Sequence, residues 1–521
     1  MFKMLLVSMG VYILLVGCAP LTDTPTVVTQ RNNIWYKNGQ KQLQKALVKK
    51  YTTQRGKAKN IILFIGDGMS ISTVTAARIL EGQNKGHSGE ENQLSFDTFP
   101  SVGLAKTYNT NAQTPDSAGT MTAIITGVKT KMGLLSLNDK AVRADCASAK
   151  GKELTTLLEL AEMKGLSTGI VTTTRLTHAT PASTYAHIPE RNWEDDSMLS
   201  KEAIKQGCKD IARQFLSFRY GDGIDVALGG GRREFMPKTM TDIEGQKGKR
   251  NDGRDLRAAW KKAHKEGKYV ETLKAFNRVN PKNTSQLFGL FNASHMHYEA
   301  DRKNDVKGEP SLSQMTEKAI EILSKNKKGF VLVVEAGRID LAHHVGNAFN
   351  ALTDTIALSK AVSIADKITS DENTLLIVTA DHSHVFTMAG YPKRGNPILG
   401  KVRSVDKHGY AKHKDEVGSD GLPYTTLSYA NGRGFRNRGK ERDADKGYES
   451  KIHRQGRVDL TKVNTQRSGF YQEAMVPLEY ETHSGEDVAI YAKGPGSQLL
   501  SGVIEQNVIF HVMKYMANLS Q

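Results

Sequence analysis

Residues 61–68 read Ile-Ile-Leu-Phe-Ile-Gly-Asp-Gly, an unbroken apolar run followed directly by an acid between two glycines. Apolar residues without polar alternation are typical of a strand buried on both faces, as the strands of parallel sheets are. Further apolar runs occur along the chain, and each predicts another strand of the same sheet. They are Gly169–Val171, Val226–Leu228, Phe330–Val334, Leu375–Val378 and, late in the chain, Val488–Tyr491.

Helical patterns separate these runs, the clearest being Ser70–Leu80, Glu153–Met163, Ser311–Leu323 and Ala342–Ile368. Apolar strands that alternate with amphipathic helices predict an α/β fold, here a three-layer α/β/α sandwich around a large, mostly parallel sheet. From about residue 391 to 477 the pattern gives way to Gly-, Lys-, Arg- and Tyr-rich sequence. We interpret this part as an insertion on the same sheet and not as an independent domain.

The composition is that of a large globular protein. The chain has 521 residues, of which 38% are hydrophobic and 24% charged. A net charge of +17 suits nucleic acid, an anionic membrane surface or small phosphorylated substrates. No recognised nucleic-acid-binding motif accompanies the basic stretches at 247–254 and 433–442. We therefore interpret them as solvated loops, with steering of anions as a second role, and expect no nucleic-acid partner.

Residues 1–17 have the shape of a secretory signal, with an apolar segment too short to span a bilayer. Their end, Leu15-Val16-Gly17-Cys18, resembles the bacterial lipoprotein box, in which the cysteine becomes the lipidated first residue. A plain signal peptide or an uncleaved anchor would also export the chain. We expect a lipid-anchored protein of the cell envelope, facing the periplasm or the cell surface, with residues 18–32 as a tether and one large domain at 33–521.

Two cysteines besides Cys18 remain, Cys146 and Cys208. Export places them in a compartment where disulfides persist, so we expect them to pair, with two free buried thiols as the alternative.

Side chains that bind metals follow four of the predicted strands. The carboxyl ends of parallel strands share one edge of a sheet, where ligands gather. Several acids at one edge repel one another unless a cation lies between them. The residues are Asp67, His178 with Thr180, Glu335, and Asp381 with His382.

A further acid and two histidines extend this set. Asp340 and His344 stand four residues apart, which places both on one face of a helix, and His483 comes late in the chain. A lone Asp-x-x-x-His is more often a surface ion pair, but mixed Asp and neutral His is a ligand set that zinc accepts. Together the residues suffice for two zinc-like sites and one oxygen-rich site suited to magnesium.

The stretch Thr114-Pro115-Asp116-Ser117 precedes a predicted helix at 121–126. Thr114 suits the helix cap and Pro115 the first turn, so Ser117 would lie among free backbone N–H groups at the positive end of the helix dipole. A serine placed there could attack an anionic centre. In isolation the stretch favours an ordinary turn with a solvated serine. The candidate metal-binding residues elsewhere in the chain instead favour a serine that acts as a nucleophile.

These residues stand in six motifs that together resemble the alkaline phosphatase family, and its animal branch more closely than the best-known enteric bacterial enzyme. The resemblance runs from about Trp35 to the C-terminus with the motifs in order. They are Asp67–Met69, Pro115–Ser117, His178–Ala182, Glu335–Asp340, Thr379–His384 and Glu481–Asp487.

The resemblance implies a phosphate monoester hydrolase that acts on small phosphate monoesters and binds two zinc ions and one magnesium ion. Ser117 would form a phosphoserine intermediate, and Arg191 would clamp two phosphate oxygens. Asp116 would orient that guanidinium or, in an alternative of similar weight, serve only as a helix N-terminal acid. The implied metal ligands are Asp340, His344 and His483 for the first zinc, Asp67, Asp381 and His382 for the second, and Asp67, Thr180 and Glu335 for magnesium, with His178 nearby.

Other parts of the chain match the animal branch as well. The cysteine pair corresponds to a disulfide of that branch, the insertion at 391–477 to its crown domain, and an amphipathic arm at 33–51 to a segment that grips the second subunit of a homodimer.

Three positions differ from the family pattern. Leu341 replaces a polar residue, His178 replaces the aspartate of the enteric enzyme, and Asn292 stands where an acidic calcium ligand is expected, which leaves calcium open.

Two other function classes remain. A phosphodiesterase or sulfatase of the same superfamily is one, although the C/S-x-P-x-R setting of sulfatases is absent from the sequence. A catalytically silent phosphate- or metal-binding lipoprotein is the other, and the presence of Ser117 with every implied zinc ligand argues against it.

Overall fold

The computed structural model describes residues 56–434 and 457–519. The expected signal segment at 1–17, the tether with Cys18 and the arm at 33–51 lie outside these residues. Within the described parts, none of the helices combines the length and the apolar character needed to cross a lipid bilayer.

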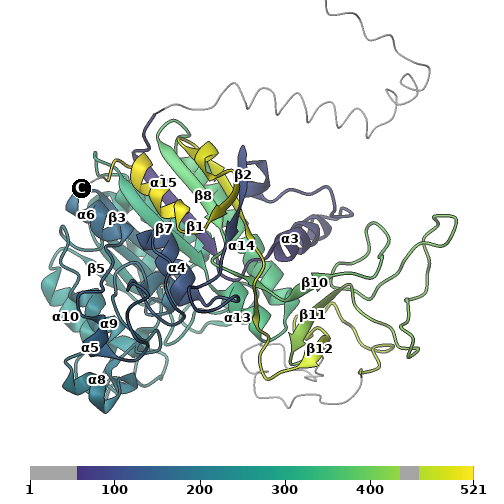
Figure 1. The fold of residues 1–521 in the computed structure, drawn as a ribbon, viewed down its shortest axis with the longest axis horizontal. Helices are drawn as coiled ribbons and strands as arrows, with labels where there is room; N and C mark the ends of the chain where they lie inside the picture. The colour runs from purple at the N-terminus through teal and green to yellow at the C-terminus, as the bar shows by residue number, and fades with distance from the viewer. Residues whose placement is uncertain (1–55, 435–456, 520–521) are drawn as a thin grey trace, which may run out of the picture. The chain divides into compact units, whose positions relative to one another are not determined.

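A ten-stranded sheet forms the centre of the domain, in the order β15-β2-β14-β8-β1-β7-β3-β4-β6-β5. Figure 1 shows its central strands β1, β7 and β8 side by side. β14 runs antiparallel to both of its neighbours, and every other pairing in this sheet is parallel. The mostly parallel sheet and all six predicted strands are therefore confirmed. The strands are β1 Asn60–Gly66, β2 Ser101–Lys106, β3 Ser167–Arg175, β4 Val226–Gly230, β5 Lys268–Val270, β6 Leu287–Leu290, β7 Phe330–Ala336, β8 Thr374–Thr379, β14 Val488–Lys493 and β15 Gly502–Glu505.

The register places the ends of the central strands at one level. Ile65 of β1 pairs with Glu335 of β7 and with Thr379 of β8, and Glu335 pairs with Thr172 of β3. Residues that follow these strands consequently emerge at the same edge of the sheet. The central strands are buried throughout because side chains on both faces meet helices.

Two groups of helices cover the sheet, and this confirms the three-layer α/β/α sandwich. Helices within each group pack against one another, and both groups reach β3 and β7, one through α12 and the other through α6. The first group is α3 Ile71–Asn84, α12 Leu312–Leu323, α13 Arg338–His344 and α14 Ala348–Ile368; the second is α4 Ser117–Thr126, α6 Leu157–Met163, α7 Ala179–Ala182 and α15 Val508–Met516.

Two predicted helices have different bounds in the structure. The single helix expected at 342–368 is wrong, because α13 ends before a turn in which Gly346 has φ 75° and Asn347 caps α14 by accepting the amide N–H of Asn350. The helix expected from 153 begins at Leu157, after Thr156 and Glu159 form a capping box. In both cases local capping outweighs a continuous apolar pattern.

The insertion does not lie on the large sheet, contrary to the expectation. Its strands β11 Leu427–Gly432 and β12 Ala474–Pro477 form a separate three-stranded sheet with β10 Phe386–Met388, which directly precedes the insertion. The physical reason is that these strands are only partly apolar: β11 alternates between buried and half-exposed positions, and β12 is largely exposed. Such strands suit a sheet that faces water on one side.

The structure brings Cys146 and Cys208 together in a disulfide, with their Cα atoms 6.1 Å apart. This separation lies within the range that a disulfide spans, and the expected pairing is supported.

Replacing both cysteines with serine is expected to lower the free energy of unfolding by up to about 4 kcal/mol, because the bridge spans 62 residues and restricts the unfolded chain. Denaturant unfolding of the oxidised and the reduced wild-type protein, with the double variant as reference, measures the difference. Equal stability of all three would contradict a bridge.

Candidate active site

Three acids meet at the carboxyl edge of the central strands. Asp67 and Asp381 follow β1 and β8, and Glu335 is the penultimate residue of β7. All three carboxylates are buried, with at most 1% exposure. The sequence-based expectation that they share one edge is met by the structure.

Ser117 is the first residue of α4 and lies buried at the same edge. The predicted cap is wrong by two residues: Asp116, not Thr114, caps the helix by accepting the amide N–H of Gly119. An aspartate is at least as good a cap as threonine, and this shift places Ser117 at the helix N-terminus itself. Its Oγ lies 3.1 Å from Nε2 of His382.

Asp116 fills both of the roles between which the sequence left a choice. Its Oδ1 accepts the cap hydrogen bond and another from the Asn109 side chain, at 3.0 Å each. Its Oδ2 accepts hydrogen bonds from Nη1 of Arg191 at 3.2 Å and from the amide of Gly133 at 2.9 Å. One carboxylate therefore fixes the helix start and the guanidinium at once.

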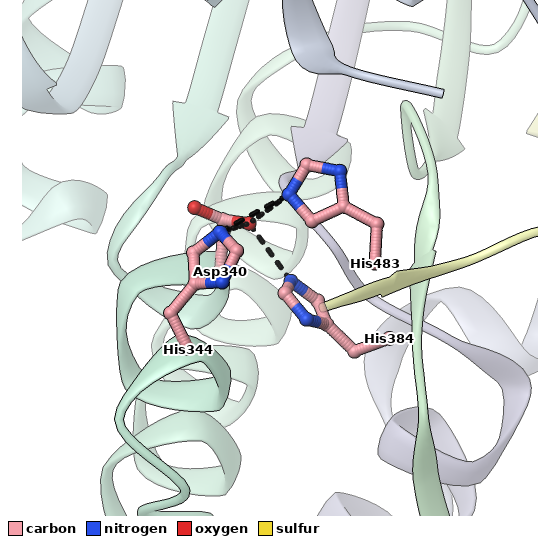
Figure 2. A group of neighbouring side chains, drawn as sticks. All are labelled: Asp340, His344, His384 and His483. Carbon is pink, nitrogen blue, oxygen red and sulfur yellow. Dashed lines mark hydrogen bonds and ion pairs between the residues drawn. The ribbon is translucent and has the colours of Figure 1, made fainter. Parts of the chain in front are cut away.

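Asp340, His344, His384 and His483 form what we call the Asp340 cluster (Figure 2). Oδ1 of Asp340 lies 3.3 Å from Nε2 of both His344 and His483, and 2.8 Å from Nε2 of His384. Nε2 of His344 and Nε2 of His483 are only 3.1 Å apart. Three imidazoles thus converge on one carboxylate. His344 comes from α13, and His384 and His483 come from the paired short strands β9 Ser383–His384 and β13 His483–Ser484.

The charges in the Asp340 cluster are strongly perturbed. Burial alone would raise the pKa of Asp340, but the charge and hydrogen bonds of His344, His384 and His483 hold it well below its usual range. Burial lowers the pKa of His483, so that this imidazole is neutral and free to donate electrons. Burial opposes the charged form of His344, but the charge and hydrogen bond of Asp340 raise its pKa. An ionised carboxylate and imidazole nitrogens are donor types that zinc accepts.

A second group, the Asp67 cluster, comprises Asp67, Asp381 and His382. Nε2 of His382 lies 3.4 Å from Oδ1 of Asp67 and 3.4 Å from Oδ2 of Asp381. Burial raises the pKa of Asp67 well above its usual value, and the neighbouring charges of Asp381, Asp340 and Glu335 raise it further. Because Ser117 contacts the same nitrogen of His382, the group stands directly beside the serine.

The third group, the Glu335 cluster, comprises Asp67, His178, Thr180 and Glu335. Ligand atoms of Asp67, His178 and Glu335 lie within 4.8 Å of one another. Burial raises the pKa of Glu335 to about 7, although the hydroxyls of Thr172 and Thr174 donate hydrogen bonds to its Oε2 and act to lower it. This group is richer in oxygen than the other two.

The Asp67 and Glu335 clusters fit metal ions, because they contain buried donor atoms that are unpaired. Five buried side-chain atoms have no hydrogen-bond partner among the described residues. Mutually repelling carboxylates with free oxygens are costly unless a cation neutralises them. The atoms are both carboxylate oxygens of Asp67, Oε1 of Glu335, Oγ1 of Thr180 and Nδ1 of His178.

Arg191 reaches the site from the loop after α7. Besides Asp116, its guanidinium contacts Nε2 of His178, at 3.4 Å from Nη2. Its side chain is 18% exposed, so it borders the buried cluster on the solvent side.

The sequence reasoning left His384 and Glu481 without a role, although both stand in quoted motifs. Nδ1 of His384 lies 2.5 Å from Oε2 of Glu481, while Nε2 faces Asp340. Burial opposes the charged imidazole, yet the two acids raise the pKa of His384 to about 10. His384 therefore bridges two acids and positions Asp340. Its position two residues after His382, in the motif that follows β8, was the signal in the sequence for such a role.

Asn292, at the expected calcium position, donates its amide N–H to Oε1 of Glu309 at 2.7 Å. His297 contacts the same oxygen at 3.1 Å. The amide of Asn292 therefore pairs with a carboxylate oxygen that would otherwise be free to bind calcium, and the structure gives no support for a calcium ion at this position.

The parallel sheet, the capped serine and the three donor clusters together define the class of protein, a metal-binding α/β hydrolase. The family model for alkaline phosphatase matches residues 58–519, and the chain belongs to the alkaline phosphatase family. Its activity is the hydrolysis of phosphate monoesters. The predicted family, enzyme class and fold are all confirmed.

Three relatives illustrate the match. The tissue-nonspecific alkaline phosphatase of Gallus gallus is 45% identical over 491 residues, covering 93% of this chain and 89% of that protein. The crystal structure of Thermus thermophilus alkaline phosphatase is 26% identical, with a TM-score of 0.62 over 90% of this chain and 93% of that one. A variant of TAB5 alkaline phosphatase, 22% identical with a TM-score of 0.58 over 90% of this chain and all of that one, is described with Mg bound in its M3 site.

Proposed function

We propose that the protein hydrolyses phosphate monoesters through a phosphoserine at Ser117, with two zinc ions and one magnesium ion bound beside it. The observation that carries this proposal is the set of buried, unpaired donor atoms around Asp67, next to the hydroxyl of Ser117. A structural serine would not need three carboxylates and neutral imidazoles at its side.

The metals are assigned by donor chemistry. The Asp340 cluster supplies nitrogen-rich ligands for one zinc through Asp340, His344 and His483. The Asp67 cluster supplies Asp67, Asp381 and His382 for the second. The oxygen-rich Glu335 cluster suits magnesium through Asp67, Thr180 and Glu335. When bound, such cations offset the negative charge of the phosphate and lower the pKa of coordinated hydroxyls.

The chain's own residues define the steps. Oγ of Ser117 forms a bond to phosphorus as the bond from phosphorus to the ester oxygen breaks, and the released alcohol takes up a proton. Water then attacks the phosphoserine, which returns the serine and releases phosphate. The free N–H groups at the start of α4 face negative charge throughout.

Arg191 is proposed to bind two phosphate oxygens, held in place by Asp116. Arg191→Ala is expected to weaken capture of the substrate and of inorganic phosphate roughly 10- to 100-fold per lost hydrogen bond, at about 1.5–3 kcal/mol each. Arg191→Lys should restore only part of the loss, because an ammonium does not match two oxygens at once.

Steady-state kinetics and inhibition by phosphate measure this prediction. Arg394→Ala, which removes an exposed arginine paired with Glu91, is the control for loss of positive charge. Equal KM and phosphate inhibition in Arg191→Ala and the control would rule out the assigned role.

The experiment that tests the function compares p-nitrophenyl phosphate, its bis ester and its sulfate on one enzyme preparation. We expect the phosphate monoester to be turned over fastest by a wide margin. Faster turnover of the diester or the sulfate would overturn the assignment in favour of a phosphodiesterase or sulfatase. Metal content, measured before and after chelation, should fall together with the activity.

The proposal extends to a homodimer that a lipid at Cys18 anchors to the cell envelope. Exposed apolar side chains on and beside β12, among them Met475 at 80% exposure, support a contact with a second copy. The insertion that carries them is proposed to act as a crown. Sedimentation analysis tests the dimer, and mass spectrometry of the mature N-terminus tests the lipid.

A further inference from the structure

A second group of acids lies at the opposite edge of the sheet, away from the active site. Glu162 is in the last turn of α6, Asp225 directly precedes β4, and Asp222 belongs to the turn before it. Donor atoms of the three carboxylates lie within 4.8 Å of one another. Because this is the amino end of β4, we call the group the amino-edge cluster.

Glu162 is the buried centre of this cluster. Its side chain is only 2% exposed, and its Oε1 accepts a hydrogen bond from the Thr168 hydroxyl at 2.5 Å. Its Oε2 forms no hydrogen bond of ordinary geometry among the described residues, although the backbone N–H of Asp222 lies near this carboxyl group and acts to lower its pKa. That oxygen faces the turn that carries Asp222, since a Cβ built on Gly221 would lie 2.1 Å from it. This oxygen therefore points toward the other acids.

Asp225 is also buried, and its Oδ2 accepts the amide N–H of Thr168 at 2.8 Å. Asp222 is exposed, so the cluster is open to water on one side. Within residues 56–434 and 457–519, none of the three acids forms an ion pair. Lys325, the cation whose charge acts on Asp225, donates its own hydrogen bonds to the carbonyls of Pro281 and Thr284.

Three carboxylates so close together destabilise one another when ionised. Burial raises the pKa of Glu162 to about 8, with the neighbouring aspartates contributing, and raises that of Asp225 to about 7. Either protons or a cation must balance this charge at neutral pH.

We propose that Glu162, Asp222 and Asp225 bind one calcium ion that stabilises the fold. All donors are carboxylate oxygens, which calcium and magnesium prefer to nitrogen ligands. Oxygens on opposite sides of a calcium ion are up to about 5 Å apart, so calcium fits donor atoms that lie within 4.8 Å of one another. Calcium also accepts the irregular shell that three carboxylates and water would form. The open side at Asp222 leaves room for water ligands.

The position of the site determines what the ion does. It joins the end of α6, the start of β3 near Thr168 and the turn that leads into β4, all at the amino edge. The proposed catalytic groups lie at the carboxyl edge. Calcium is therefore expected to raise stability without changing turnover, and this inference does not depend on the mechanism proposed above.

The test uses the zinc- and magnesium-loaded full-length protein in buffer with excess Mg²⁺, and compares wild type with Asp222→Asn and Glu162→Gln. Equilibrium dialysis with Ca²⁺ should show one fewer ion per chain in either variant. Thermal unfolding should show that Ca²⁺ raises the Tm of the wild type but not of the variants. At a calcium concentration 100 times the Kd, the unfolding equilibrium constant should fall roughly 100-fold.

Asp139→Asn is the matched control, because Asp139 is an exposed aspartate outside all the clusters. It should bind as much calcium as the wild type, and hydrolysis of p-nitrophenyl phosphate should be unchanged in the control and in Asp222→Asn. Equal calcium binding by Asp222→Asn and Asp139→Asn would overturn the proposal. So would displacement of the calcium by the excess Mg²⁺.

Discussion

Ser117→Ala is expected to reduce hydrolysis of phosphate monoesters by at least about 1,000-fold, because the nucleophile is lost while the metal ligands and Arg191 remain. Folding should be unaffected. Alanine is a good helix residue, and the cap of α4 is supplied by Asp116 and not by the serine. The far-ultraviolet circular dichroism and metal content of the variant should therefore match those of the wild type.

The serine step has a direct readout besides rate. Acid quenching during turnover of a ³²P-labelled monoester should leave label on the peptide that contains Ser117, and none in the alanine variant. Ser183→Ala is a matched control, since its buried hydroxyl donates only to the carbonyl of Ala179 in α7. Undiminished hydrolysis by Ser117→Ala would refute the phosphoserine mechanism.

The second large effect is expected for Asp340→Asn, with a loss of one zinc per chain and a fall in activity of at least about 100-fold. Oδ1 of Asp340 is the atom on which His344, His384 and His483 converge. A neutral amide is a weaker metal ligand, and its N–H₂ group cannot accept from His384. The variant would also lack the negative charge of Asp340, which is the carboxylate on which the three histidines converge.

Metal analysis after dialysis and assays at rising zinc concentration measure this change. Excess zinc should recover part of the activity of Asp340→Asn, which distinguishes weak metal binding from misfolding. Asp366→Asn makes the same charge change in an ion pair with Lys493 at the surface and should behave as wild type. A full zinc complement in Asp340→Asn would exclude Asp340 as a ligand.

The sequence alone determined the fold class and most of the chemistry. Continuous apolar runs identified the six strands named from the sequence, because a strand buried on both faces excludes polar residues along its whole length. Acids placed directly after those runs identified the edge at which the site forms. Family motifs then assigned roles that spacing by itself left open, such as that of Arg191.

The weaker elements lay beyond sequence reasoning. β5 and β15 are short and partly exposed, so their apolar signal is faint. The break between α13 and α14 depends on a positive φ at Gly346, which an apolar pattern does not register. Capping is likewise a choice among neighbouring polar residues, and only the folded turn selects Asp116 over Thr114.

Only the tertiary structure decided which side chains contact one another, and through which oxygen or nitrogen atoms. Asp116 serves both the helix and Arg191 because its two oxygens face different partners. His384 is a positioning residue because its Nε2 lies 2.8 Å from Oδ1 of Asp340. Glu162 meets Asp222 and Asp225 although some 60 residues separate them in the chain. Such meetings depend on strand order and register, which bring distant residues within a few ångströms, and no local pattern in the sequence encodes that distance.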